Sequence, residues 1–132
     1  MDLAPSPPLK KLVLLLHAAR PDQPDTCQMP FVYAMTAAAM EVEVEMHFTG
    51  QSVRLLVEGV AQAIPSGAQQ QKTLYDSMQD AAQLGVRFLA CSMALQEHVG
   101  ADEVKIAEFG GAAGAATLIM RSLDPEWRML NF

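Results

Sequence analysis

The sequence predicts an α/β protein with a three-layer α/β/α architecture, in which helices cover both faces of a five-stranded, mainly parallel sheet. The first observation is that short apolar runs, long enough only for strands, alternate with longer segments of helical periodicity. The second is that the run at 11–18 is apolar at consecutive positions, which is typical of a strand buried on both faces of a parallel sheet, while the short apolar run at 86–91 has the length of a buried strand. Five strands in such a sheet favour the flavodoxin-like order 2-1-3-4-5.

The composition indicates a globular protein and argues against several kinds of binding site. The chain has 132 residues, of which 51% are hydrophobic, and this suits one globular domain with a single core. Its net charge of −6 comes without a basic run, which argues against nucleic-acid binding. Two cysteines can neither build a disulfide framework nor supply a metal site at this spacing, so we expect a reducing, cytoplasmic location and no metal.

The N-terminal segment needs to be separated from the domain. Residues 1–10 form a Pro-rich lead-in, and residues 11–132 are expected to form a single domain. The apolar run at 12–19 has the length of a signal-peptide core, but acidic and proline residues precede it and His17 interrupts it, so a strand is favoured. No apolar stretch reaches the ~18 residues of a membrane span.

The first strand is predicted at Lys11–Ala18, and a loop rich in Pro and Asp follows it. Asp25 or Thr26 can cap the next helix, because both side chains accept hydrogen bonds from free N–H groups. That helix tolerates Pro30 only in its first turn and continues to about Met40.

The second strand is predicted from an alternation of polarity over 42–48. One face carries Val42, Val44, Met46 and Phe48, and the other carries Glu41, Glu43, Glu45 and His47. Such alternation indicates a strand with one solvated face, so we expect this strand at or near an edge of the sheet.

The remaining elements follow from the same periodicity and breaker signals. In chain order they are a helix over 52–64, a helix ending near 84, a strand over 86–91 that runs into a short helix from 92, a strand over 104–107, a helix opened by Gly110-Gly111 and ending near Leu123, and a strand over 127–132.

Cys91 falls at the junction of the predicted strand over 86–91 and the short helix that follows it. A thiol at the carboxyl end of a strand and the start of a helix meets unpaired N–H groups and the positive end of a helix dipole. The backbone N–H groups of Ser92 and Met93 are the expected donors. Thiolate is the reactive form of cysteine, so this position predicts a reactive or sulfur-carrying thiol. The alternative is a buried structural cysteine.

Other candidate residues are expected around the same crevice. In the order 2-1-3-4-5 the sheet reverses direction between strands one and three, and ligands bind at such a point. Cys27 follows the first strand, so it could serve as a second thiol or simply start a helix. His17 and His47 lie near strand ends and could tune the thiolate, or could be solvated.

Gly110-Gly111 could line this crevice with backbone N–H groups. The run lacks the first glycine of a dinucleotide-binding fingerprint and has too little chain behind it for that unit, so no cofactor is expected.

The sequence resembles the DsrE/DsrF-like (YchN-like) family of small sulfur-relay proteins. The matching pieces are the first strand Lys-Leu-Val-Leu-Leu-Leu, the block from His47 to Leu56 (His-Phe-Thr-Gly-Gln-Ser-Val-Arg-Leu-Leu), the segment Leu89-Ala90-Cys91-Ser92-Met93-Ala94-Leu95, and Gly110-Gly111-Ala112-Ala113. Together they cover nearly the whole chain after residue 10.

The resemblance implies a three-layer fold, assembly into homotrimers or homohexamers, and a cysteine that carries sulfane sulfur as a persulfide. Only Cys91 matches the position of that cysteine. The expected function is therefore a sulfur carrier or sulfurtransferase that exchanges sulfur with a rhodanese- or TusA-like protein. Two alternatives stay open: a non-catalytic scaffold subunit of a relay complex, and a thiol-redox protein that uses Cys91 with Cys27.

Overall fold

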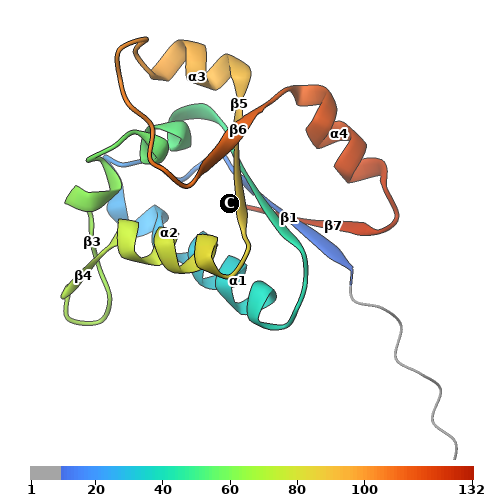
Figure 1. The fold of residues 1–132 in the computed structure, drawn as a ribbon, viewed down its shortest axis with the longest axis horizontal. Coiled ribbons are helices and arrows are strands. Elements are labelled where there is room, and N and C mark those ends of the chain that lie inside the picture. The colour runs from blue at the N-terminus through green and yellow to red at the C-terminus, as the bar shows by residue number, and fades with distance from the viewer. Residues whose placement is uncertain (1–9) are drawn as a thin grey trace, which may run out of the picture.

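The computed structural model describes residues 10–132, and the predicted lead-in lies outside them except for Lys10. Five strands form one sheet in the order β6-β5-β2-β1-β7, and every pairing in it is parallel (Figure 1). The strands are β1 (Lys11–Leu16), β2 (Val44–Phe48), β5 (Arg87–Cys91), β6 (Phe109–Ala113) and β7 (Trp127–Asn131), and the short β3 (Pro65–Ser66) and β4 (Lys72–Thr73) form a separate antiparallel hairpin.

Over the described residues, four α-helices accompany the sheet: α1 (Gln28–Ala39), α2 (Leu74–Gln83), α3 (Ser92–His98) and α4 (Ala115–Leu123). Figure 1 shows the strands running between α1 and α2 on one side and α4 on the other, which confirms the predicted three-layer α/β/α class. The main core lies under α1 and α2, where the fully buried rings of Phe31, Phe48 and Phe88 have their centroids 5.6–6.2 Å apart. None of the described helices has the length and apolar character to cross a membrane.

The predicted strand order is wrong. β2 pairs with both β1 and β5, so the second strand lies at the centre of the sheet, and β7 pairs with the other side of β1. The order of the five strands is therefore 4-3-2-1-5, and no reversal separates strands one and three. Cys91 lies at the end of β5, next to β2 and β6.

The predicted edge position of the second strand is wrong for the same reason. All five residues of β2 are buried, and Glu45 and His47 have exposed fractions of only 1% and 4%. Their polarity reflects a buried polar network and not contact with solvent. Glu41 and Glu43, by contrast, precede the strand and are exposed.

The region from 104 to 113 also differs from the prediction. Residues 104–107 form no strand of the main sheet, and the fourth strand is β6, which contains the two glycines expected to open a helix. A Cβ atom at Gly110 would lie 2.8 Å from the backbone oxygen of Phe88, and Gly111 has a φ of +127°. These glycines form an irregular step in the pairing with β5, after which Ala113 lies opposite Cys91. The segment over 52–64 forms the 3-10 turns η2 (Gly50–Leu56) and η3 (Ala61–Ala63), while η1 (Pro24–Thr26) precedes α1.

Candidate functional site

The carboxyl ends of β2, β5 and β6 bring three residues to one face of the sheet. Cys91 pairs with Ala113, and His47 pairs with Leu89. Because side chains two positions apart in a strand share a face, His47, Cys91 and Ala113 all project to the side covered by α4. The sheet register thus places a histidine diagonally next to the cysteine.

A cavity of about 150 Å³ opens at this place. It is lined by His47, Thr49, Cys91, Ala113, Gly114, Ala115 and Leu118. Cys91 is half-buried in its wall. Pockets for drug-sized ligands measure roughly 300–1,000 Å³, so this one suits a group of a few atoms at the end of a larger molecule.

Cys91 is the residue that precedes the first turn of α3, as predicted, but its thiol accepts no capping hydrogen bond from that turn. Ser92 is half-buried, and Met93 is 67% exposed and does not line the cavity. The helix end that does border the cavity is the N-terminus of α4, where Gly114 and Ala115 contribute to the wall. Sequence reasoning missed this helix end, because Gly110-Gly111 were assigned to it.

Behind the cavity, Glu45 is the centre of a buried polar network. The Nε and Nη2 atoms of Arg121 donate to its two carboxylate oxygens at 3.1 and 3.2 Å, which ties α4 to β2. Arg87 Nη1 donates at 3.4 Å, and His47 Nε2 lies 3.0 Å from Oε1. The Arg121 guanidinium also lies over the ring of Trp127, 4.6 Å from its centroid. Glu45 therefore positions both the helix and the histidine that line the cavity.

Because Glu45 is buried and charged, part of the stability of the fold should depend on pH. Burial alone would raise the pKa of this carboxyl, but hydrogen bonds from Arg121 and His47 outweigh burial and hold its pKa below the ordinary 4.5. Ionised Glu45 thus stabilises the folded state above about pH 4.5, and this contribution is lost as the pH falls through the pKa that Glu45 has in the folded protein.

Replacing Glu45 with glutamine should lower the free energy of unfolding by about 1–3 kcal/mol near neutral pH, because buried donors lose a charged acceptor. The difference in the free energy of unfolding between Glu45→Gln and the wild type should become smaller below pH 4.5. Urea unfolding at a series of pH values measures this difference. Glu43→Gln, on an exposed neighbour, is the control. A gap that is constant with pH would contradict the assigned ionisation.

His17 lies at the end of β1 but outside the cavity. Its side chain is exposed, and its Nδ1 lies 3.2 Å from the Thr49 hydroxyl, which donates to the backbone oxygen of Leu16 at 2.7 Å. His17 therefore contacts a residue of the wall without entering the site.

Cys27 does not join Cys91 in this cavity. It precedes the first turn of α1, in place of the expected cap Asp25 or Thr26, and is fully buried. Its thiol donates to the backbone oxygen of Arg20 at 3.2 Å. Burial raises the pKa of this thiol, although its hydrogen bonds with Thr26 and Arg20 oppose the shift.

The two cysteines should therefore differ in reactivity. Iodoacetamide should modify Cys91 in the folded protein and reach Cys27 only after denaturation, because Cys27 is buried and held as a thiol. Peptide mapping after limited alkylation measures this. Equal modification of both residues in the folded protein would show that Cys27 is accessible.

Gly110 and Gly111 do not line the cavity either. Their effect on the site is indirect. The register between β6 and β5 shifts at these glycines, and after the shift Ala113 lies opposite Cys91. The glycine that borders the site is Gly114.

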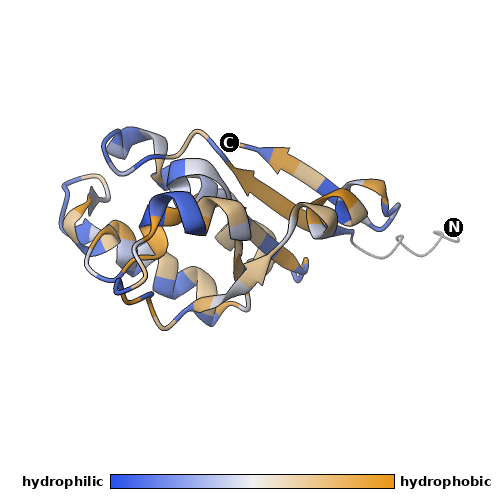
Figure 2. Cartoon of the chain, turned by 90° about the horizontal axis from the view of Figure 1, so that it is seen from above, coloured by the Kyte–Doolittle hydropathy of each residue, from blue (hydrophilic) through white to orange (hydrophobic). Residues whose placement is uncertain are grey.

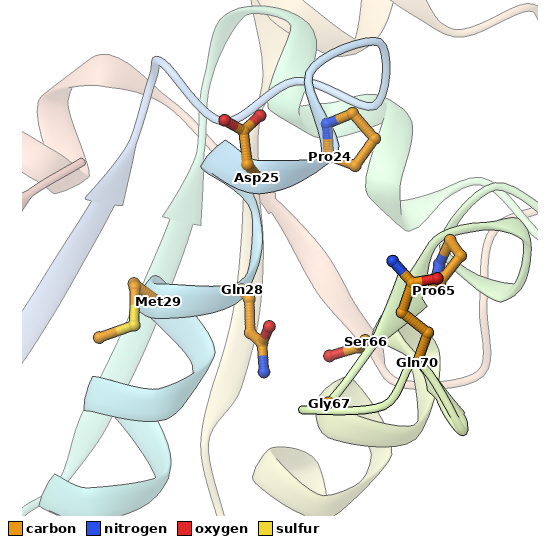
Figure 3. Close-up of a pocket in the computed structure, with 8 residues that line it drawn as sticks. All are labelled: Pro24, Asp25, Gln28, Met29, Pro65, Ser66, Gly67 and Gln70. Atoms are coloured by element: carbon orange, nitrogen blue, oxygen red, sulfur yellow. The ribbon is translucent and has the colours of Figure 1, made fainter.

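A larger cavity of about 500 Å³ lies between the start of α1 and the β3–β4 hairpin (Figure 3). Gln28 and Ser66 point into it from the two sides. Its wall contains neither a cysteine nor a histidine, so the cavity has no thiol that could carry sulfur. Within the described part of the chain, no three His, Cys, Asp or Glu residues are grouped to hold a metal ion.

Comparisons with known proteins agree with this architecture. The chain is similar to the ychN protein from E. coli, with a TM-score of 0.73 and 12% sequence identity over 94% of this chain and 100% of that chain. It is also similar to MTH1491, a protein of unknown function from Methanobacterium thermoautotrophicum, with a TM-score of 0.61 and 15% identity over 95% of this chain and 100% of that chain. These likenesses concern the fold. No curated protein matches the chain.

The model of one protein family matches nearly all the described residues. The match is to the DsrE/DsrF-like family and spans residues 11–132, from the first residue of β1 to the end of the chain. It includes every strand of the main sheet and every residue of the Cys91 cavity. The chain belongs to the DsrE/DsrF-like family.

Proposed function

We propose that the protein is a sulfur carrier, or sulfurtransferase, that holds sulfane sulfur on Cys91 as a persulfide or thiosulfonate and passes it to a partner thiol. The observation that carries the proposal is the half-buried Cys91 in the wall of a small cavity at the carboxyl ends of the strands. Membership of the DsrE/DsrF-like family supports a role in a sulfur relay.

In the loading step, the Cys91 thiolate attacks the outer sulfur of a donor persulfide. A bond forms between the two sulfurs, the sulfur–sulfur bond of the donor breaks, and the donor departs as a thiolate. Discharge is the same exchange in the other direction, with the thiolate of the acceptor attacking the outer sulfur on Cys91. No external oxidant or reductant is consumed, because the sulfane sulfur keeps its oxidation level.

The cavity fits such a cargo. Its volume of about 150 Å³ accommodates one or a few sulfur atoms beside Cys91, while its apolar walls from Ala113 and Leu118 limit access of water. The N-terminus of α4 at Gly114 and Ala115 presents a positive helix end, which favours an anionic persulfide or thiosulfonate.

The donor or acceptor is proposed to be a rhodanese- or TusA-like protein in the cytoplasm, whose reactive cysteine reaches the cavity from outside. Assembly into a homotrimer or homohexamer forms part of the same proposal. It is supported by the outer face of α4, where Ile119, Met120 and Leu123 are 56%, 66% and 78% exposed. Figure 2 shows orange, apolar stretches on α4 and on the adjacent β7. Light scattering on the full chain measures the number of subunits.

The proposal is tested by intact-mass analysis of the reduced protein after incubation with polysulfide or tetrathionate. A carrier gains mass that corresponds to sulfur or thiosulfonate, the adduct maps to Cys91, and a thiol removes it. No adduct on an alkylatable Cys91 would favour the scaffold role. A loss of the mass of two hydrogen atoms, with a disulfide mapped between Cys91 and Cys27, would favour thiol-redox chemistry, which the burial of Cys27 opposes.

A further inference from the structure

His47 is a buried histidine in the wall of the Cys91 cavity. Only 4% of the residue is exposed, and it enters the cavity from β2 while Cys91 enters from β5. A histidine at such a place is held by specific partners, and these partners determine which ring nitrogen carries a proton.

One ring nitrogen of His47 is committed to Glu45. His47 Nε2 lies 3.0 Å from Glu45 Oε1, and Glu45 is an ionised carboxylate within hydrogen-bonding distance of two arginines. An ionised carboxylate only accepts hydrogen bonds. Nε2 therefore carries a hydrogen and donates it to Glu45.

The other ring nitrogen, Nδ1, is free to face the cavity. Over residues 10–132, no hydrogen bond to Nδ1 of His47 is present, and no fully enclosed side-chain nitrogen or oxygen lacks a partner. Nδ1 is thus accessible, and the cavity that His47 lines is the one that contains the Cys91 thiol. In the neutral ring with hydrogen on Nε2, Nδ1 is a proton acceptor.

We propose that His47, held by Glu45, accepts the proton of the Cys91 thiol during sulfur loading. This inference rests on the proposed function and adds the base to it. The S–H bond of Cys91 breaks, the proton moves to Nδ1, and the pair becomes a thiolate and an imidazolium. After the thiolate has taken the outer sulfur of the donor, the proton on Nδ1 passes to the departing thiolate of the donor, so that His47 returns to its neutral form.

Glu45 is the positioning residue in this arrangement. It fixes the ring through Nε2, and its negative charge stabilises the imidazolium, which is how a buried carboxylate assists a histidine next to a nucleophile. The other charged groups around the pair are Arg121 on α4 and Arg87 on β5, which share the carboxylate of Glu45. His17 reaches the cavity only through the hydroxyl of Thr49. Apart from His47 and Cys91, none of the lining residues carries an acid or a base.

The proposal is tested by the rate of Cys91 alkylation with iodoacetamide as a function of pH, in a Cys27→Ser background. His47→Gln should move the rate profile to higher pH and lower the rate near neutral pH about tenfold or more, because the thiol then ionises without a base. Glu45→Gln should move the profile in the same direction by a smaller amount. His98→Gln is the matched control, since His98 also has a carboxylate neighbour, Glu97, at 3.6 Å but lies outside the cavity. Superimposable profiles for His47→Gln and the parent would overturn the proposal.

A second measurement keeps the test decisive if His47→Gln fails to fold. The NMR titration of the His47 ring is compared between the parent and Cys91→Ser, and a coupled pair requires the two titration curves to differ. Identical curves would overturn the role of His47. Failure of the proposed carrier function can be distinguished from failure of the proposed role of His47. A wild-type protein that takes up no sulfur from polysulfide at any pH is not a carrier. If only the base is missing, His47→Gln should still take up sulfur at about pH 9, where free thiols ionise unaided.

Discussion

Replacing Cys91 with serine is expected to reduce sulfur loading from polysulfide to background, while Cys27→Ser loads as the wild type does. The reason is chemical, because a serine hydroxyl does not ionise near neutral pH and forms no sulfur–sulfur bond. Intact-mass analysis after incubation with the donor measures the fraction that carries added sulfur. The structure makes Cys27→Ser a matched control, since both cysteines are free but only Cys91 lines the cavity.

The substitution should leave the fold intact. Cys91 is half-buried and its thiol makes no capping hydrogen bond, so exchanging sulfur for oxygen removes no native partner. An unchanged urea midpoint for Cys91→Ser would confirm this. Loading that survives in Cys91→Ser at the wild-type level would contradict the assignment of the sulfur-carrying residue.

Truncation of Phe88 to alanine is expected to have the largest effect on stability. Phe88 is fully buried and its ring makes edge-on contacts with Phe31 at 6.0 Å and with Phe48 at 5.6 Å. Removing a buried aromatic ring costs about 3–5 kcal/mol, against a typical total stability of about 5–15 kcal/mol. Because Phe88 is in β5, three residues before Cys91, the end of this strand should also loosen.

Urea unfolding measures the effect as a lower midpoint at similar cooperativity. Tyr33→Ala is the matched control, since its ring also contacts an aromatic neighbour, Phe132, at 5.6 Å, but Tyr33 is 46% exposed. It should cost about 1 kcal/mol or less. A similar loss for Phe88→Ala and Tyr33→Ala would show that the three buried rings are not the main core.

The sequence predicted the part of the site that depends on local signals. The run before Cys91 is apolar and the helical pattern starts at Ser92, so the strand-to-helix junction was predictable, and β5 and α3 meet there. The first and last strands were also predicted, and both form in the structure as β1 and β7. The α/β/α class followed from this alternation.

The central position of β2 in the sheet was not predicted, because it depends on contacts with residues far away in the sequence. Glu45 and His47 alternate with apolar residues as in a solvated strand, yet both are buried, since Arg121 reaches Glu45 from 76 residues further along the chain. The pattern in β2 alone does not distinguish a carboxylate in water from one paired with a distant arginine. An arginine in an otherwise apolar helix, as in α4, was the available hint of a buried partner.

The two glycines of β6 were misassigned for a related reason. Small residues before an apolar helix are typical of a helix start, whereas the pairing of β6 with β5 shows that these two glycines belong to a strand. This error also affected the predicted site, because α4 in fact starts at Gly114 and Ala115, which line the cavity together with Cys91.

The central claim is that Cys91 carries sulfur and passes it on, and the most direct test follows labelled sulfur through both steps. The full chain is loaded from a donor that contains isotopically labelled sulfane sulfur, freed of excess donor, and mixed with a reduced rhodanese- or TusA-like acceptor. We expect the label to map to Cys91 after loading and to the cysteine of the acceptor after mixing, with neither step occurring in Cys91→Ser. Label that never binds Cys91, or that reaches the acceptor equally well with Cys91→Ser, would contradict the account.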